Sequence, residues 1–177
     1  MTVLHHLWLP IVASSVFVFV VSSIIHMLLP WHKGDYRKIP NEDKVMDALR
    51  PLNIPNGDYM VPNCDDMKEM RTPEFKAKRE RGPVFIATFM SGEMAIGKSL
   101  VLWFVYILVI SYCAAFVGAH AGAIHSRRII GVTSFLGYGG ALCQMSIWYK
   151  RSWGTTIRSL IDGAIYAAVT AATFAWL

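Results

Sequence analysis

Long apolar runs alternate with polar segments along this chain, and four of the runs are long enough to cross a lipid bilayer. They cover residues 7–29, 99–123, 129–148 and 155–177, and glycines interrupt the third. About 20 helical residues, at about 1.5 Å each, span the hydrocarbon of a bilayer. The pattern therefore predicts an all-α membrane protein, a bundle of four transmembrane helices in a single membrane domain over residues 1–177.

A polar insertion, residues 30–97, separates the first two predicted spans and carries signals of local structure. Two short helices are predicted, one over residues 42–50 and one that begins at the N-cap Thr72. Residues 58–62 and 84–90 have the pattern of short strands that can pair. Because a two-stranded sheet is marginal alone, we expect a small cytoplasmic α+β insertion that lies against the membrane face or a partner.

Basic residues give the predicted orientation of the four spans. Twelve of the 17 Lys and Arg residues lie between Lys33 and Lys98, and Lys150 begins a basic stretch in the third connection. The second connection carries only Arg127 and Arg128. Cytoplasmic loops collect positive charge, so both termini should face outward and the insertion inward. The net charge of +5 is then a signal for membrane topology, and we expect no nucleic-acid partner.

Residues 91–99 contain a literal phosphate-loop pattern, G-x-x-x-x-G-K-S, made by Gly92, Gly97, Lys98 and Ser99. A phosphate loop needs a parallel sheet beneath the helix that follows it. Here that helix must enter lipid, and the polar chain that remains offers at most two strands. We interpret the motif as a chance match and expect no nucleotide partner.

Polar residues recur along one side of each predicted span. The stripes are Ser15, Ser22 and His26 in the first; Ser99, Tyr106, Cys113 and His120 in the second; Gly137, Ala141 and Gln144 in the third; and Asp162, Tyr166, Thr170 and Thr173 in the fourth. Unsatisfied polar atoms are costly in hydrocarbon, so all four stripes are expected to point into the bundle.

One polar side chain from each span is predicted to lie at a similar depth near the cytoplasmic end. This polar layer consists of His26, Tyr106, Gln144 and Asp162. Arg158 can pair with Asp162 at i, i+4. Three interpretations stay open: structural contacts, a proton, quinone or ion site, and a haem or metal site. For haem, His26 has His32 nearby, but Pro30 lies between them.

Small residues are placed for close helix packing. Small residues recur every fourth position in two of the spans. They are Gly118 and Gly122 in the second span, and Gly163, Ala167 and Ala171 in the fourth. Such ladders let helix backbones approach closely in a membrane. The fourth span carries small residues on more of its surface than one neighbouring helix can cover. We therefore expect it to contact a further membrane protein or a second copy of this chain.

Residues 22–50, "GDYMVP" at 57–62 and "GKSLVLWFVY" at 97–106 together resemble a group of uncharacterised bacterial inner-membrane proteins of similar length. The resemblance covers most of the chain. It implies a bacterial inner-membrane protein with four helices, and it transfers no catalytic residue because the group has no assigned activity.

The expected function is that of a non-catalytic accessory or scaffold subunit of a membrane complex, in contact with membrane lipids. The sequence shows no nucleophile–base pair, no paired carboxylates in a cleft and no C-x-x-C metal pattern. No cofactor is required for this interpretation. The alternative is a small redox or transport component that binds a proton, quinone or ion at the layer with His26 and Asp162.

Overall fold

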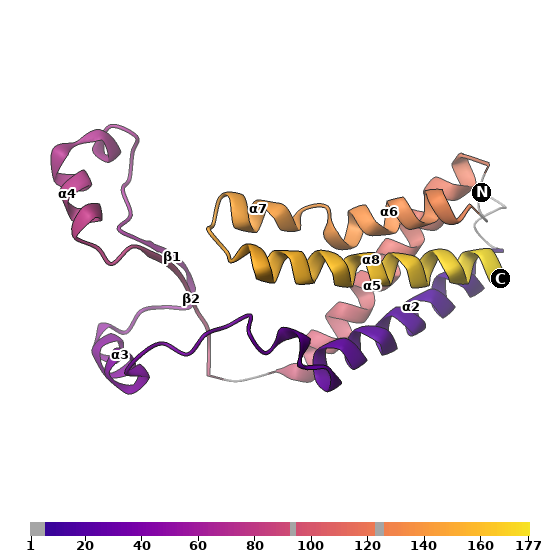
Figure 1. The fold of residues 1–177 in the computed structure, drawn as a ribbon, viewed down its shortest axis with the longest axis horizontal. Helices are drawn as coiled ribbons and strands as arrows, with labels where there is room; N and C mark the ends of the chain where they lie inside the picture. The colour runs from indigo at the N-terminus through magenta and orange to yellow at the C-terminus, as the bar shows by residue number, and fades with distance from the viewer. Residues whose placement is uncertain (1–5, 93–94, 123–125) are drawn as a thin grey trace. The chain divides into compact units, whose positions relative to one another are not determined.

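The computed structural model describes residues 6–92, 95–122 and 126–177, and the chain divides into two compact units. We call residues up to 37 and from 95 onwards the helical unit, and residues 38–94 the insertion. The helices of the helical unit are α2 (Trp8–Ser23), α5 (Ile96–His120), α6 (Arg127–Gly139), α7 (Leu142–Ile147) and α8 (Trp153–Trp176) (Figure 1).

In the helical unit, α8 packs against α2, α6 and α7, while α5 covers α2 and α6. Hydroxyl groups join α2 to α5, because the Ser111 hydroxyl lies 3.2 Å from that of Ser14 and 3.3 Å from that of Ser15. The Trp103 indole also donates to the Ser22 hydroxyl, at 2.9 Å. These side-chain contacts are favourable between helices where water is absent.

Within the described part of the chain, three helical segments are long and apolar enough to cross a membrane. They are Trp8–Leu28, Ile96–His120 and Trp153–Trp176, and they correspond to the first, second and fourth predicted spans. The third predicted span is divided between α6 and α7. Its break falls at Gly140, where an added Cβ would lie only 2.7 Å from the Leu136 carbonyl oxygen, and glycines weaken helices.

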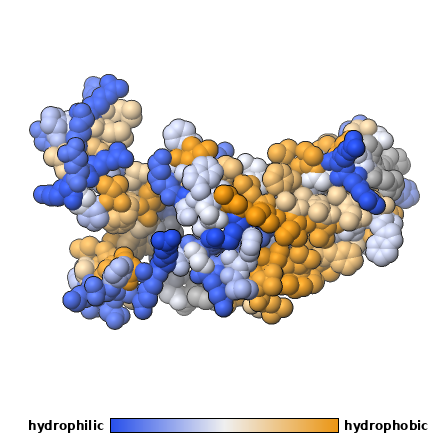
Figure 2. Space-filling view, in the orientation of Figure 1, coloured by the Kyte–Doolittle hydropathy of each residue, from blue (hydrophilic) through white to orange (hydrophobic). Residues whose placement is uncertain are grey.

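The helical unit exposes many large apolar side chains, and its interior mixes apolar with polar side chains. Large apolar side chains such as Val16, Val101 and Leu102 are exposed, whereas the interior holds Ser, Thr and Asp side chains. Figure 2 shows apolar residues spread over the visible surface of the helices. An apolar exterior around an interior that includes small and polar residues is typical of helices that face lipid.

The predicted stripes have two different outcomes. Ser15 and Ser22 of the first stripe are buried, as is the whole α8 stripe of Asp162, Tyr166, Thr170 and Thr173, so the prediction is confirmed for these residues. His26, the third member of the first stripe, is exposed. In the second span Ser99, Tyr106, Cys113 and His120 are exposed, and in the third Ala141 and Gln144 are exposed, so for these residues the expectation that they point inward is wrong. Gly137 instead faces α5, because a Cβ added there would lie 3.1 Å from the side chain of Ile110.

Two polar side chains of the exposed α5 stripe contact carbonyl oxygens of their own helix segment. Ser99 donates to the Ala95 carbonyl at 3.4 Å, and a ring nitrogen of His120 lies 2.8 Å from the Phe116 carbonyl oxygen. A side chain bonded to its own helix can face outward at little cost. The buried side of α5 is instead made by Ile107, Ile110, Ser111, Ala114, Ala115 and Gly118.

The small residues of α8 pack where the sequence predicts. Gly163, Ala167 and Ala171 are buried. A Cβ added at Gly163 would meet the Cβ of Tyr138 at 3.4 Å, which shows how closely α6 lies to α8. Gly118 is also buried, whereas Gly122 follows the end of α5 with a positive φ of 62°.

The insertion contains α3 (Glu42–Leu49), β1 (Gly57–Val61), α4 (Pro73–Arg81) and β2 (Phe85–Phe89). The strands pair antiparallel, with Tyr59 opposite Ala87, and form a two-stranded sheet among the described residues. Thr72 caps α4 by accepting a hydrogen bond from the Phe75 backbone N–H at 3.2 Å. The predicted strand pair and both short helices of the insertion are therefore confirmed.

Candidate functional site

A change in helix type at the end of α2 shapes the site. The helix widens into a π-turn over Ile24–Leu28, which contains His26. Pro30 cannot continue a helix, and it forces the residue before it into an extended conformation; Leu29 has φ −87° and ψ 143°. The chain then enters a 3₁₀ turn, Pro30–His32, which contacts α8. Single π-turns inside helices frequently occur at functional sites.

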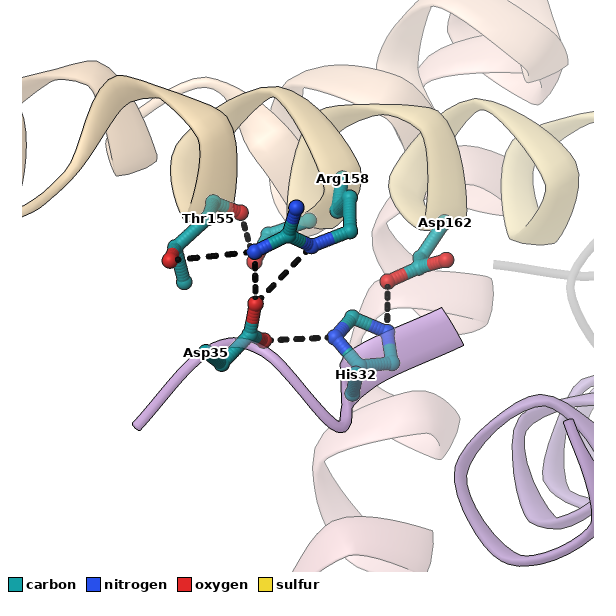
Figure 3. A network of polar contacts seen from close by, with 6 residues as sticks. His32, Asp35, Thr155, Arg158 and Asp162 are labelled. Atoms are coloured by element: carbon teal, nitrogen blue, oxygen red, sulfur yellow. Dashed lines mark hydrogen bonds and ion pairs between the residues drawn. The ribbon is translucent and has the colours of Figure 1, made fainter. Parts of the chain in front are cut away.

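His32 connects this turn to α8. Its Nδ1 lies 2.6 Å from Oδ2 of Asp35, and its Nε2 lies 2.8 Å from Oδ2 of Asp162 (Figure 3). The side chain of Asp162 is only 5% exposed. Because Asp35 and Asp162 come from segments far apart in the sequence, His32 bridges the start and the end of the helical unit.

Arg158 holds Asp35 from the opposite side. Its Nε donates to Oδ1 of Asp35 at 2.9 Å, and its Nη2 donates to the same oxygen (Figure 3). Burial by itself would raise the pKa of the Asp35 carboxyl, but hydrogen bonds from His32 and Arg158 lower the pKa below its usual value. Asp35 is therefore a carboxylate, which can only accept hydrogen bonds.

The charge of Asp35 determines the tautomer of His32. A carboxylate acceptor requires the proton of a neutral His32 to be on Nδ1, so Nε2 is left with a lone pair. That lone pair faces an oxygen of Asp162 at 2.8 Å. Two acceptors at this distance repel each other unless a positive charge lies between them or on the imidazole.

His26 completes the group. Its ring centroid lies 4.5 Å from that of His32, and His26, His32 and Asp162 each offer a ligand atom within 4.8 Å of the other two. Among the described residues, His32 Nε2 and Asp162 Oδ1 are buried and make no hydrogen bond of acceptable geometry. We call His26, His32, Asp35, Arg158 and Asp162 the His–Asp cluster.

The charges within the His–Asp cluster do not balance when both imidazoles are neutral. The cluster contains two carboxyl side chains, Asp35 and Asp162, but only one guanidinium, that of Arg158. A partly buried, uncompensated carboxylate is costly. The cluster is therefore suited to attract a cation.

The residues of the predicted polar layer are brought together only in part. His26 and Asp162 meet through His32. Tyr106 is half-exposed and donates to the Gly137 carbonyl at 2.6 Å, and Gln144 is exposed. Arg158 pairs with Asp35 in place of the local i, i+4 partner, Asp162, that the sequence suggests.

Sequence reasoning missed His32 and Asp35 as members of the site. Pro30 was treated as a separator of the two histidines, but the turn that it starts brings the rings together. The signal was present in the spacing, because Pro-x-His-x-x-Asp directly after an apolar run places an imidazole and a carboxylate on one short turn.

The phosphate-loop pattern leads directly into α5. Gly97, Lys98 and Ser99 lie in the first turn of this helix, which is one of the three membrane candidates. The strand before the pattern, β2, pairs antiparallel with β1. This context differs from the parallel strand and sheet-covering helix on which phosphate loops depend.

Comparison with known proteins gives no further assignment: no family model, curated protein or solved structure matches this chain. The bacterial origin and the inner-membrane location implied by the resemblance therefore stay predictions.

Proposed function

We propose that this chain is a small integral membrane protein that binds a cation in the His–Asp cluster. The observation that carries the proposal is the 2.8 Å approach of His32 Nε2 to Asp162 Oδ2, while Asp35 occupies the other ring nitrogen. A cation between or beside these atoms removes their repulsion and offsets the extra negative charge. Ionisable groups within membrane proteins frequently mark ion pathways.

The proposed setting is a bacterial inner membrane with four spans. In this arrangement α6 and α7 together make the third crossing, both termini face outward, and the insertion is cytoplasmic. The distribution of Lys and Arg supports this orientation. The His–Asp cluster then lies at the cytoplasmic end of the bundle, within reach of ions from the cytoplasm, and an ion-dependent transport component is the role that fits it best.

Thermal unfolding in detergent tests cation binding. The full chain is stripped with a chelator and then heated with Na⁺, K⁺, Mg²⁺, Ca²⁺, Zn²⁺ or Co²⁺ in turn. A ligand that binds only the folded state raises the unfolding midpoint, so at least one cation should do so at millimolar concentration or below. Asp162→Asn, which removes the uncompensated charge, should abolish the response.

The matched control is Asp43→Asn, which removes an exposed carboxylate from the insertion and should leave the response intact. If no cation raises the unfolding midpoint of the wild-type chain, the proposal is contradicted. A protonated His32 would then be the positive charge beside Asp162.

The second candidate is the accessory subunit, and one observation favours it. Ala164, Ala168 and Ala172 form an exposed ladder on α8, beside the buried ladder that packs on α6. Small residues at this spacing suit a second, closely packed helix. Purification in native lipids followed by mass spectrometry should retain a partner or a second copy, which Ala168→Leu should release. A chain that stays monomeric throughout would contradict this candidate.

A further inference from the structure

We propose that the cation is a divalent transition-metal ion, bound directly by His26, His32 and Asp162. This inference rests on the proposed cation-binding function and makes it specific. Three observations point to it: three donor atoms converge, two buried polar atoms lack hydrogen bonds, and a second carboxylate orients one of the imidazoles.

The donor set selects the class of ion. Two imidazole nitrogens and one carboxylate oxygen are ligands that Zn²⁺ and other first-row divalent ions accept. Ca²⁺ and Mg²⁺ prefer oxygen ligands alone, and Mg²⁺ keeps much of its water. The group of His26, His32 and Asp162 therefore favours a transition metal over the common alkaline-earth ions.

The distances require a modest adjustment. Ligands about 2.1 Å from a tetrahedral ion lie about 3.4 Å from one another. The three donors lie within 4.8 Å of one another, so the widest separation must shorten by at most about 1.4 Å. His26 is exposed and can move its ring, while the contact between His32 and Asp162 must open slightly from 2.8 Å to admit the ion.

Asp35 and Arg158 supply the support that metal-binding histidines usually have. A ligating histidine commonly donates its other ring N–H to a carboxylate, which fixes the tautomer and makes the ligand nitrogen more basic. Asp35 holds His32 Nδ1 in this way, at 2.6 Å. Arg158 in turn holds Asp35 through two nitrogens. Asp35 and Arg158 are therefore positioning residues, and neither contacts the ion.

Three protein ligands leave at least one coordination position for water or another ligand. Structural zinc sites are normally closed by four protein ligands, whereas sites that exchange a ligand keep an open position. The exposure of His26 gives this site access from outside the bundle. Three protein ligands hold an ion less firmly than a closed set of four, which agrees with a transport role better than with a purely structural one.

Metal binding to the full chain tests the inference. The protein is purified with a tag that contains no histidine, stripped with a chelator and dialysed against Zn²⁺ or Co²⁺. The expected result is about one ion per chain by elemental mass spectrometry, with visible Co²⁺ absorption from a site of low coordination number. His26→Ala and Asp162→Asn should each weaken binding by more than about 100-fold, which exceeds the 10- to 100-fold loss typical when a residue that only orients a ligand is replaced.

His120→Ala is the matched control, because His120 is an exposed histidine at the C-terminal end of α5 and should not change the affinity. His26→Ala keeps the experiment decisive if Asp162→Asn fails to fold, since the side chain of His26 is exposed. Equal binding by His26→Ala and wild type overturns the inference.

The remaining outcomes separate this inference from the proposed function. If Na⁺, K⁺, Mg²⁺ or Ca²⁺ raises the unfolding midpoint while Zn²⁺ and Co²⁺ do not bind, the transition-metal site is wrong and cation binding stands. If no cation binds or stabilises the chain, both proposals fail together.

Discussion

At the scale of single residues, the properties of the site come from which nitrogen of His32 carries a proton. Asp35 fixes that proton on Nδ1, so Nε2 is available as an acceptor or a ligand. Without Asp35, His32 could turn or change tautomer, and Nε2 would have no reason to face Asp162. One carboxylate outside the apolar segments therefore controls the chemistry of a buried pair.

Replacing Asp35 should weaken the site without removing it. Asp35→Asn keeps the size of the side chain but loses the charge that holds His32 Nδ1–H, so we expect an affinity loss of about 10- to 100-fold with unchanged stoichiometry. Equilibrium dialysis with Co²⁺ measures the affinity. The visible spectrum of bound Co²⁺ should persist at saturating metal, because the ligands themselves remain.

A purely structural role of Asp35 gives a different result. In that case Asp35→Asn lowers the unfolding midpoint in the absence of metal and leaves the Co²⁺ affinity of the folded fraction at the wild-type value. Asp35→Glu retains the negative charge and should recover part of the affinity.

At the scale of elements, α8 organises the helical unit. It contacts α2, α6 and α7 and carries Arg158 and Asp162. Its close approach to α6 depends on the absence of a side chain at Gly163, where an added Cβ would lie 3.5 Å from the backbone nitrogen of Gly139. The helix that provides two of the five residues of the His–Asp cluster is thus positioned by a small residue of the same helix.

A large side chain at Gly163 should separate α6 from α8. We expect Gly163→Leu to destabilise the helical unit by about 1–3 kcal/mol, the usual cost of overpacking, seen as a lower unfolding midpoint in detergent. Gly163→Ala adds a Cβ at ordinary contact distance and should change the midpoint much less. Ala164→Leu, at the exposed neighbouring position, is the control. If Ala164→Leu lowers the unfolding midpoint as much as Gly163→Leu does, the close approach of α6 to α8 at Gly163 is contradicted.

The N-cap of α4 should contribute to the stability of the insertion on its own. Thr72→Ala removes the acceptor of the Phe75 N–H bond and should cost about 1 kcal/mol, or about a fivefold increase in local opening. Hydrogen exchange of the α4 amides measures this change. Thr72→Ser keeps the hydroxyl oxygen, so its α4 amides should exchange at nearly the wild-type rate. Equally fast exchange in Thr72→Ser and Thr72→Ala would contradict the role of the cap.

At the scale of the whole molecule, the distribution of basic residues supports the proposed orientation. The insertion carries most of the Lys and Arg residues, while Arg127 and Arg128 at the start of α6 are the basic pair of the second connection. Inner membranes retain positive loops on the cytoplasmic side. The proposed cytoplasmic position of the His–Asp cluster depends on this orientation, so it needs a direct measurement.

Cysteine labelling provides that measurement. In a variant with Cys64, Cys113 and Cys143 replaced by serine, Arg128→Cys should react with an impermeant maleimide added to intact cells. Lys76→Cys, on exposed α4, should react only after the membrane is opened. The opposite pattern would reverse the orientation and place the His–Asp cluster at the outer end of the bundle.

The sequence alone determined the features that depend on local pattern. Apolar length predicted the three membrane candidates that are present, since crossing hydrocarbon requires a long run of apolar residues whatever their neighbours are. Turn and cap residues predicted the strand pair and short helices of the insertion, because those signals act within a few residues. The buried stripe of α8, with Asp162 in it, also followed from periodicity.

Only the tertiary structure decided which polar groups meet. The second span carries a polar stripe as regular as that of α8, yet its residues are exposed, and two of them, Ser99 and His120, contact carbonyl oxygens of their own helix segment. The His–Asp cluster joins residues 26–35 to residues 158–162, and a reversal at Pro30 brings them together. A site made by the meeting of distant segments depends on helix packing, which periodicity along one segment does not encode.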